Sequence, residues 1–381
     1  MIKSNVTTKS FGSPGRYIQG PGEINRLPVH TEKFGMKIFA IIDPFFYDDL
    51  SEKLLASYTE ANNQFMSVMY ECEVTCERIA AISEKAKAFG PDAIIAIGGG
   101  KTLDTGKGVS DTLKLPIIIV PTSASTDAPT SALSVIYKEN HEHSHPINYT
   151  KSPDLVLVDS EIIANAPVRF LISGMGDALA TLFEAKANAA SNSNNYIAQE
   201  AGGFKRTRVS MAIAQLCYDT IIENGLSAKI ANENHAVTES LEAVIEANTL
   251  MSGLGFENTG CACAHAVGDG ITATINGTKT LHGEKVAFGI LCQMVAENTP
   301  QHTVKEFITF CMNIGLPTTL DDLYVEVTNE NLQIIAENAS EPELGREPYA
   351  LSIPMLKDII KSADALGHYY KNMQRFTKGQ L

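Results

Sequence analysis

The sequence predicts an α/β N-terminal domain, with a doubly wound parallel sheet, followed by an all-α C-terminal domain. Three observations point to this fold class. Continuous apolar runs of strand length alternate with helical segments up to about residue 160. No such run follows, and the later segments have helical spacing. A chain of 381 residues is also long for a single core, so we expect domains at residues 1–162 and 163–381.

The strands of the first domain are expected to be parallel and buried on both faces. Residues 37–43 form an apolar run that ends in a carboxylate. Three further runs of the same kind follow, at 93–97, 116–120 and 155–159. Runs without polar alternation are typical of parallel strands that helices cover on both faces. Residues 77–89 have helical spacing and end at Gly90-Pro91, which stops a helix.

The second domain is expected to contain helices only. Four stretches favour helix, at 195–217, 236–250, 284–297 and 304–314. No run of β-branched residues in this half looks like a core strand.

Composition and charge limit the possible functions. Apolar residues make up 44% and charged residues 19%, which is the balance of a globular enzyme. The net charge of -14 argues against nucleic acid or an anionic membrane as a partner, although backbone N–H groups can still bind an anionic cofactor. No signal peptide and no apolar run of membrane length is visible. Seven cysteines without a framework spacing, Cys72 and Cys76 among them, favour a reduced, cytoplasmic location.

A glycine turn follows the predicted strand at 93–97. Gly98, Gly99 and Gly100 allow the backbone to approach a phosphate, and a helix that starts there directs its N-terminal dipole at the anion. Lys101-Thr102 comes directly after the glycines, so the turn is neither G-x-G-x-x-G nor a Walker A loop. A plain strand-to-helix turn is the alternative reading.

A polar loop follows the predicted strand at 116–120. Residues 121–131 carry several hydroxyl side chains and one carboxylate, at a strand end where doubly wound domains bind ligands. A capped turn is the alternative. Asp43 closes the first strand, where an acid can bind a ribose diol and repel a 2′-phosphate, which favours NAD over NADP. A strand-end aspartate also caps turns.

Three residues far apart in the chain have the side chains of a divalent-metal site: Asp177, His265 and His282. One carboxylate and two imidazoles, without a cysteine, leave coordination positions open for substrate. Each residue alone has a structural alternative, namely an N-cap for Asp177, a core histidine for His265 and a loop cap for His282. A metal with open positions together with a nucleotide site suggests metal-assisted hydride transfer.

Two other clusters are interpreted as structural. Cys261 shares a helical face with His265, but we expect Cys261 to pack as a small apolar residue. His141, His143 and His145 alternate along what looks like a hairpin or exposed loop, and a solvated segment is favoured over a metal site.

Taken together, residues 98–104, 121–137, 174–185 and 265–288 resemble the glycerol dehydrogenases. These belong to the metal-dependent, iron-containing alcohol dehydrogenase superfamily, whose fold is related to dehydroquinate synthase. The similarity runs from Tyr17 to about residue 320, and residues 126–137 are very specific. The resemblance implies an NAD-binding domain, a helical domain, and a Zn²⁺ or Fe²⁺ site in the cleft between them. It also implies a homo-oligomer, often an octamer.

By position, the resemblance implies that Asp177, His265 and His282 bind the metal and that Asp127 contacts the substrate. It further implies a set of NAD contacts: Asp43, Gly98, Gly99, Gly100, Lys101, Thr102, Leu103, Asp104, Thr122, Ser123, Ala124, Ser125, Ser131, Leu133 and Tyr137.

The sequence departs from the family pattern at two places. Gly268 stands where the family usually has a second histidine after the first metal histidine. Residues 341–346 stand roughly in place of another histidine-containing stretch. Both changes are expected to affect the substrate pocket rather than the metal ligands.

The resemblance implies reversible NAD-dependent oxidation of a secondary alcohol in a small polyol, such as glycerol to dihydroxyacetone, or in a 1,2-diol. The metal would act as a Lewis acid on the reacting hydroxyl, and the nicotinamide would accept the hydride. The alternatives are a dehydrogenase for another hydroxy compound, a dehydroquinate synthase-like lyase, and a catalytically silent NAD-binding homologue. The lyase needs a dense basic pocket, and the second half has few clustered Lys and Arg residues.

Overall fold

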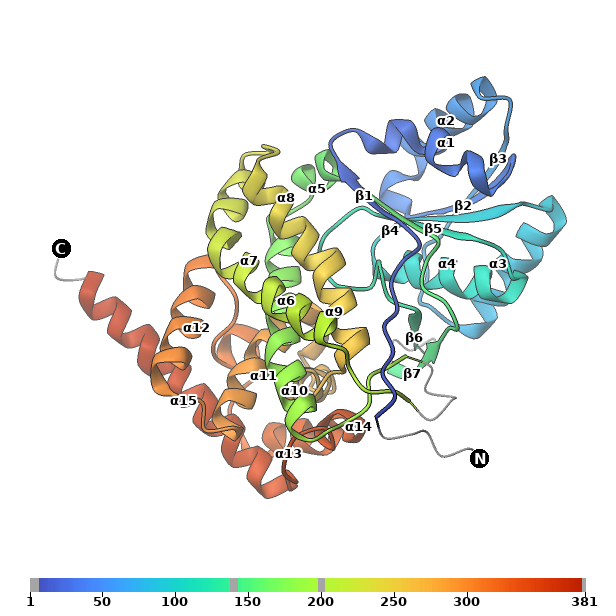
Figure 1. Ribbon diagram of the computed structural model, residues 1–381. Helices are drawn as coiled ribbons and strands as arrows, with labels where there is room; N and C mark the ends of the chain where they lie inside the picture. The colour runs from blue at the N-terminus through green and yellow to red at the C-terminus, as the bar shows by residue number, and fades with distance from the viewer. Residues whose placement is uncertain (1–6, 138–142, 198–202, 379–381) are drawn as a thin grey trace. The chain divides into compact units, whose positions relative to one another are not determined.

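The computed structural model describes residues 7–137, 143–197 and 203–378 (Figure 1). The chain divides into two units. The α/β unit consists of Gly12–Pro167 and Ala231–Leu254, and the helical unit consists of Met1–Phe11, Val168–Ile230 and Gly255–Leu381. The single boundary predicted between residues 162 and 163 does not describe these units, because a short segment of each half of the chain packs with the other unit.

The α/β unit is built on one six-stranded parallel sheet, in the order β1-β8-β5-β4-β2-β3. The four predicted strands are its centre. The edge strands β1 and β3 were not predicted, because they are only partly buried and lack a continuous apolar run. The strand bounds are β1 (Tyr17–Gly20), β2 (Lys37–Ile42), β3 (Gln64–Met69), β4 (Ala93–Gly98), β5 (Ile117–Pro121) and β8 (Leu155–Asp159).

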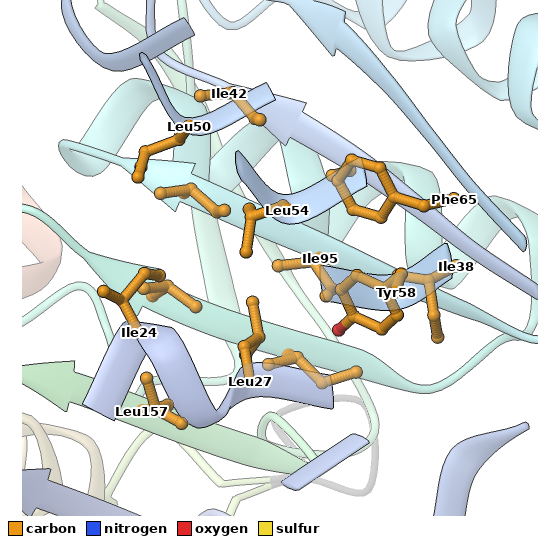
Figure 2. Close-up of a cluster of buried hydrophobic side chains, with 14 of the residues drawn as sticks. Ile24, Leu27, Ile38, Ile42, Leu50, Leu54, Tyr58, Phe65, Ile95 and Leu157 are labelled. Carbon is orange, nitrogen blue, oxygen red and sulfur yellow. The ribbon is translucent and has the colours of Figure 1, made fainter. Parts of the chain in front are cut away.

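Helices cover both faces of this sheet, as Figure 1 shows, with α1 (Leu27–Thr31) and α2 (Pro44–Glu60) on one side and α3 (Cys76–Phe89) and α4 (Gly100–Leu113) on the other. Leu50, Leu54 and Tyr58 recur every four residues on α2 and enter the core (Figure 2). The ring of Tyr58 stacks on Phe65 of β3 with centroids 5.0 Å apart. The predicted doubly wound architecture is therefore confirmed.

A small antiparallel hairpin, β6 (Leu133–Tyr137) and β7 (His143–Asn148), follows the polar loop. It contains part of the predicted histidine cluster, and His145 pairs with Ile136 across the hairpin. His141 lies outside the described residues.

The helical unit is built from these helices: α6 (Val168–Ala190), α7 (Arg208–Glu233), α9 (Ser252–Thr259), α10 (Cys263–Thr272), α11 (His282–Ala296), α12 (Gln301–Ile314), α13 (Asn329–Asn338), α14 (Glu341–Leu344) and α15 (Ile353–Lys378). Helices α7 and α9 each extend a few residues across a unit boundary. Among the described residues after Asp159 there is no further strand, as predicted. None of the helices in the described part of the chain is long and apolar enough to cross a membrane.

The helix predicted from residue 195 is wrong at its start, since α7 begins at Arg208. Tertiary hydrogen bonds hold the chain before α7 in another conformation. The guanidinium of Arg206 donates to the carbonyl oxygens of Asn188 (2.9 Å) and Ala189 (2.8 Å), and so satisfies the C-terminal end of α6. Local helical propensity does not reveal such a contact.

Residues 231–254 join the α/β unit because they are fastened to the polar loop after β5. Here α8 (Glu239–Glu246) continues into a π-helical turn, Ala247–Met251. The side-chain amide of Asn248 donates to the Ala124 carbonyl (2.9 Å), and the Thr130 hydroxyl donates to the Thr249 carbonyl (3.0 Å). The absence of a side chain at Gly253 makes room for this contact, since a Cβ there would lie 1.9 Å from the Thr130 hydroxyl oxygen.

We expect Gly106→Ala to destabilise the protein by about 1–3 kcal/mol, because α4 packs directly on the sheet at this residue. An added Cβ would lie 2.4 Å from Cβ of Ala96 in β4. Urea denaturation measures the effect. Gly20→Ala is the matched control, since its Cβ would lie at an ordinary 3.7 Å from Glu23. A Gly106→Ala variant as stable as the wild type would contradict this packing.

Candidate functional site

Glycines allow α6 and α11 of the helical unit to approach each other closely. A Cβ at Gly283 would lie 1.8 Å from the carbonyl oxygen of Ser173, and a Cβ at Gly176 would lie 2.3 Å from the carbonyl oxygen of Gly283. Asp177 follows Gly176 on α6, and His282 precedes Gly283 on α11. The close approach of the two backbones therefore brings these two predicted ligands together.

A glycine also allows α10 and α11 to approach each other closely. A Cβ at Gly289 would lie 2.1 Å from the carbonyl oxygen of Ala264, the residue before His265. All three predicted metal ligands thus come from helices whose separation is set by glycine.

The start of α11 is fixed by a second contact with α6. Arg169 donates two hydrogen bonds to the carboxylate of Glu284, of 2.6 and 2.7 Å. Glu284 in turn accepts a hydrogen bond from the backbone N–H of Leu281 (2.7 Å) and so caps the helix that begins at His282.

The three predicted ligands converge on one point. Nε2 of His265 lies 3.2 Å and Nε2 of His282 lies 3.4 Å from Oδ1 of Asp177. Two donor atoms bound to one tetrahedral Zn²⁺ lie about 3.3 Å apart, given metal–ligand distances of about 2.0–2.1 Å. The spacing is therefore that of a group that could hold a single metal ion.

The three side chains of this group differ in how much of their surface is exposed. The side chain of Asp177 is 1% exposed, that of His265 13% and that of His282 41%, so the group is accessible to solvent from the His282 side. Asp177 lies in the middle of α6 (Val168–Ala190), which removes the N-cap alternative. His282 is the first residue of α11 rather than a loop residue.

Electrostatics favour positive charge at this point. Burial opposes ionisation of Asp177, but His282 and His265 lower its pKa well below the ordinary range. Burial opposes protonation of His265, but the carboxylates of Glu184 and Asp177 raise its pKa well above the ordinary value. The lowered pKa of Asp177 and the raised pKa of His265 both indicate a site that stabilises a cation.

Glu184 is a functional candidate that the sequence reasoning missed. Its side chain is fully buried, and one oxygen, Oε2, lies 2.7 Å from Nδ1 of His265. The other, Oε1, accepts hydrogen bonds from the backbone N–H groups of Ala262 (2.8 Å) and His265 (2.9 Å). One signal was present in the sequence: Asp177 and Glu184 are the only acidic residues of α6, and a spacing of seven puts them on one helix face.

The rest of the α10 N-terminus is capped by other side chains of the helical unit. The backbone N–H of Cys263 donates to Oε1 of Glu347 (3.0 Å), and that of Ala264 donates to Oε1 of Gln293 (3.3 Å). The N-cap residue of α10, Ala262, has no side-chain group to serve this purpose, so the buried donors are satisfied by long-range partners. Burial raises the pKa of Glu347 to about 8.

Cys261 lies beside this site but before the first residue of α10. Its Sγ lies within 4.8 Å of ligand atoms of Glu184 and His265. The predicted proximity to His265 therefore does not arise from a shared helical face. Burial raises the pKa of Cys261 to about 12, which keeps the thiol protonated and agrees with a packing role.

Asp43 and the glycine turn lie at the carboxyl ends of β2 and β4 in the α/β unit, and the predicted residues Thr122 to Ser125 follow the next strand, β5. Strands β2 and β4 are neighbours, and the chain order reverses between them because β3 lies on the far side of β2. Such a switch point is where doubly wound sheets bind ligands. A Cβ at Gly98 would lie 2.8 Å from Cβ of Asp43, so the glycine turn and the strand-end acid lie side by side.

The glycine turn leaves backbone accessible. A Cβ at Gly99 would meet nothing within 4 Å, and no side chain caps the helix α4 that begins at Gly100. Uncapped N–H groups at the start of a helix are a favourable anion site. Asp43 also caps α2, since its Oδ1 accepts a hydrogen bond from the backbone N–H of Phe45 (3.0 Å).

Some of the predicted cofactor residues are buried in the protein. Oδ2 of Asp104 accepts from the N–H of Val135 (2.9 Å), and its Oδ1 pairs with Nζ of the buried Lys107 (3.2 Å). Lys107 also donates to the carbonyl oxygens of Ala128 (2.6 Å) and Leu133 (2.9 Å). These two residues tie α4 to the polar loop. The buried members of the predicted set are Gly98, Thr102, Leu103, Asp104, Thr122, Ala124 and Ser131.

The remaining members of the predicted set are partly or fully exposed. Lys101 is exposed and pairs with Glu73, while the hydroxyls of Ser123 and Ser125 lie 3.1 Å apart. Asp127 lies in the same loop, where its Oδ2 accepts a hydrogen bond from the Ser252 hydroxyl (3.3 Å).

Residues 341–346, which depart from the family pattern, include the short helix α14 and contact Tyr196 rather than forming an open loop. The Tyr196 hydroxyl donates to Glu343 (2.7 Å), and the Arg346 guanidinium lies 4.1 Å from the centre of the Tyr196 ring.

Comparison with known proteins gives a consistent result. A family model described as iron-containing alcohol dehydrogenase matches residues 14–160. A glycerol dehydrogenase of Thermotoga maritima is 42% identical over 97% of this chain and 100% of its own length. A glycolaldehyde reductase of Halobacterium salinarum is 40% identical over 94% of this chain and 98% of its own.

Solved structures agree. A probable glycerol dehydrogenase from Sinorhizobium meliloti is 38% identical and superposes with a TM-score of 0.88, covering 95% of this chain and 99% of its own. Glycerol dehydrogenase from Schizosaccharomyces pombe is 34% identical with the same TM-score, and the coverage is 98% of this chain and 94% of that one. This likeness extends over nearly the whole length of both chains. The chain therefore belongs to the iron-containing alcohol dehydrogenase family, in the group that includes the glycerol dehydrogenases.

Proposed function

We propose that this enzyme catalyses the NAD-dependent and metal-dependent oxidation of a secondary alcohol in a small polyol, such as glycerol to dihydroxyacetone, or in a 1,2-diol. One observation carries the proposal: the donor atoms of Asp177, His265 and His282 have the spacing of one metal ion, and the group is open to solvent at His282. The substrate class is supported by relatives named for glycerol and glycolaldehyde, both small hydroxylated molecules.

Asp177, His265 and His282 would hold the metal, and this donor set suits Zn²⁺ and Fe²⁺ alike. When bound, the ion supplies Lewis acidity that lowers the pKa of a coordinated hydroxyl. The protein holds the three ligands in place through the glycine contacts of α6, α10 and α11. Asp127 would orient a substrate hydroxyl as a hydrogen-bond acceptor, which is a binding role.

The α/β unit would hold NAD at the carboxyl ends of β2 and β4. The exposed backbone of Gly99 and the uncapped start of α4 fit a pyrophosphate, and Asp43 fits a ribose diol. NAD bound there would supply the hydride acceptor. The other residues of the predicted set are proposed as further contacts of NAD.

The competing functions have less support. Neither a lyase of the dehydroquinate synthase type nor a silent homologue is favoured, since the relatives above are named as dehydrogenases and a reductase. Measuring NADH formation by metal-reconstituted protein against a panel of polyols and hydroxy compounds tests the proposal. A protein that binds metal and NAD but oxidises none of them would overturn it.

The reduced, cytoplasmic location stays part of the proposal. It is supported by the seven cysteines, none of which forms a disulfide bond in the described part of the chain. Self-association, up to an octamer, is carried over from the family resemblance, and light scattering of the purified protein measures it.

We predict that chelation of the metal, or His282→Ala, lowers kcat/KM by roughly 10²–10³-fold or more, since Lewis-acid catalysis contributes several kcal/mol. The fold should survive, because His282 lies at the exposed end of the group. Metal content and circular dichroism accompany the rate measurement. His302→Ala, at an exposed position of α12, is the matched control. Full activity of metal-free protein would contradict the mechanism.

We predict that Asp43→Ser lowers the NAD-over-NADP ratio of kcat/KM by roughly tenfold, which corresponds to about 1.4 kcal/mol. The serine keeps a cap for α2 but removes the carboxylate that binds the ribose diol and repels a 2′-phosphate. Asp48→Ser, exposed on the same helix, controls for net charge. Equal use of both cofactors by the wild type would show that Asp43 does not select between them.

We predict that the wild type uses 1,2-diols or bulkier hydroxy compounds relatively well and glycerol less well than is usual in the family, because Gly268 supplies no hydrogen-bonding imidazole. Gly268→His should shift the ratio of specificity constants toward glycerol. A Cβ at this position meets Val286 at an ordinary 3.4 Å, so the backbone tolerates a side chain. Gly268→Ala is the control that adds bulk alone. An unchanged ratio in Gly268→His would show that residue 268 does not contact substrate.

A further inference from the structure

The carboxylate of Glu184 makes two kinds of contact at once. Oε1 caps the buried start of α10 through the N–H groups of Ala262 and His265, whereas Oε2 faces Nδ1 of the His265 ring. Because the side chain is fully buried and held at both oxygens, neither oxygen is free to turn toward solvent.

The contact at Oε2 determines which ring nitrogen of His265 carries the proton. A carboxylate oxygen can only accept, so Nδ1 must donate, and a neutral ring then presents the lone pair of Nε2. Nε2 is the atom that lies 3.2 Å from Asp177 in the group of three. The correct tautomer for metal binding is thus enforced by a residue that does not itself bind the metal.

We propose that Glu184 is a positioning residue that fixes the orientation and tautomer of His265 and thereby sets the metal affinity of the site. The inference rests on the proposed function, in which Asp177, His265 and His282 hold the ion. Carboxylates that accept from the second ring nitrogen of a histidine ligand act in this way in many metal sites.

Glu184→Gln separates this role from the capping of α10. The amide oxygen of glutamine can still accept from the two backbone N–H groups. The amide nitrogen that replaces Oε2, however, donates to Nδ1 and leaves the ring proton on Nε2, where it blocks a metal. The variant therefore keeps the helix cap and inverts the tautomer.

Glu347→Gln is the matched control. Glu347 caps the same helix end, but through the N–H of Cys263 rather than through that of His265. Since burial raises the pKa of Glu347 to about 8, its carboxyl group is mostly protonated at neutral pH, and glutamine closely resembles it. A loss of affinity common to both variants would point to the helix cap.

The test measures the dissociation constant for Zn²⁺ by competition with a chromophoric chelator. We expect Glu184→Gln to weaken binding by roughly 10–100-fold and Glu347→Gln to leave it unchanged. Wild-type affinity in Glu184→Gln overturns the inference, and so does an equal loss in both variants. A wild type that binds no Zn²⁺ overturns the proposed function instead, so the two failures are distinguishable.

A measurement on the wild type covers the case in which Glu184→Gln does not fold. In Zn²⁺-loaded protein with ¹⁵N-labelled histidine, the His265 ring should carry a slowly exchanging proton on Nδ1, because its partner Glu184 is fully buried. A ring with the proton on Nε2, or with the metal on Nδ1, overturns the inference.

Discussion

The closeness of three helix backbones is the constraint on which the helical unit depends. Gly176, Gly283 and Gly289 remove the side chains that would otherwise separate α6, α10 and α11. At this separation, one short carboxylate and two imidazoles can reach a common point without distortion. A Cβ at any of the three positions would lie within 2.3 Å of a backbone carbonyl oxygen, so the adjustment would have to come from the helices themselves.

Close packing has an electrostatic counterpart, because α10 begins inside the protein. Its first N–H groups are removed from water and must find acceptors. Glu184, Glu347 and Gln293 supply them from three other segments of the unit. The carboxylate of Glu184 at this helix start also stabilises the helix dipole, so one side chain both holds α10 in place and makes the site attractive to a cation.

The sequence predicted those features for which a residue pattern has a single physical explanation. Continuous apolar runs predicted the four central strands, since only fully covered strands lack polar alternation. Asp177, His265 and His282 could be selected because their side chains are typical of metal ligands. The edge strand β3 and the start of α7 could not be predicted, because partial burial and the Arg206 contacts depend on distant segments. Lys107 and Glu184 were missed because their contacts form only when distant segments pack, although the spacing of Glu184 from Asp177 was a signal.

The contacts between residues 231–254 and the polar loop affect the order in which the protein folds during its synthesis. A ribosome that has reached residue 167 has synthesised all six strands of the parallel sheet, but not the π-helical turn that holds Ala124 and Thr130. The loop at the end of β5 therefore lacks its partner while the next stretch of chain is synthesised. The α/β unit reaches its final form only after residues 168–230 of the helical unit have also been synthesised, so its maturation is later than its position in the chain suggests.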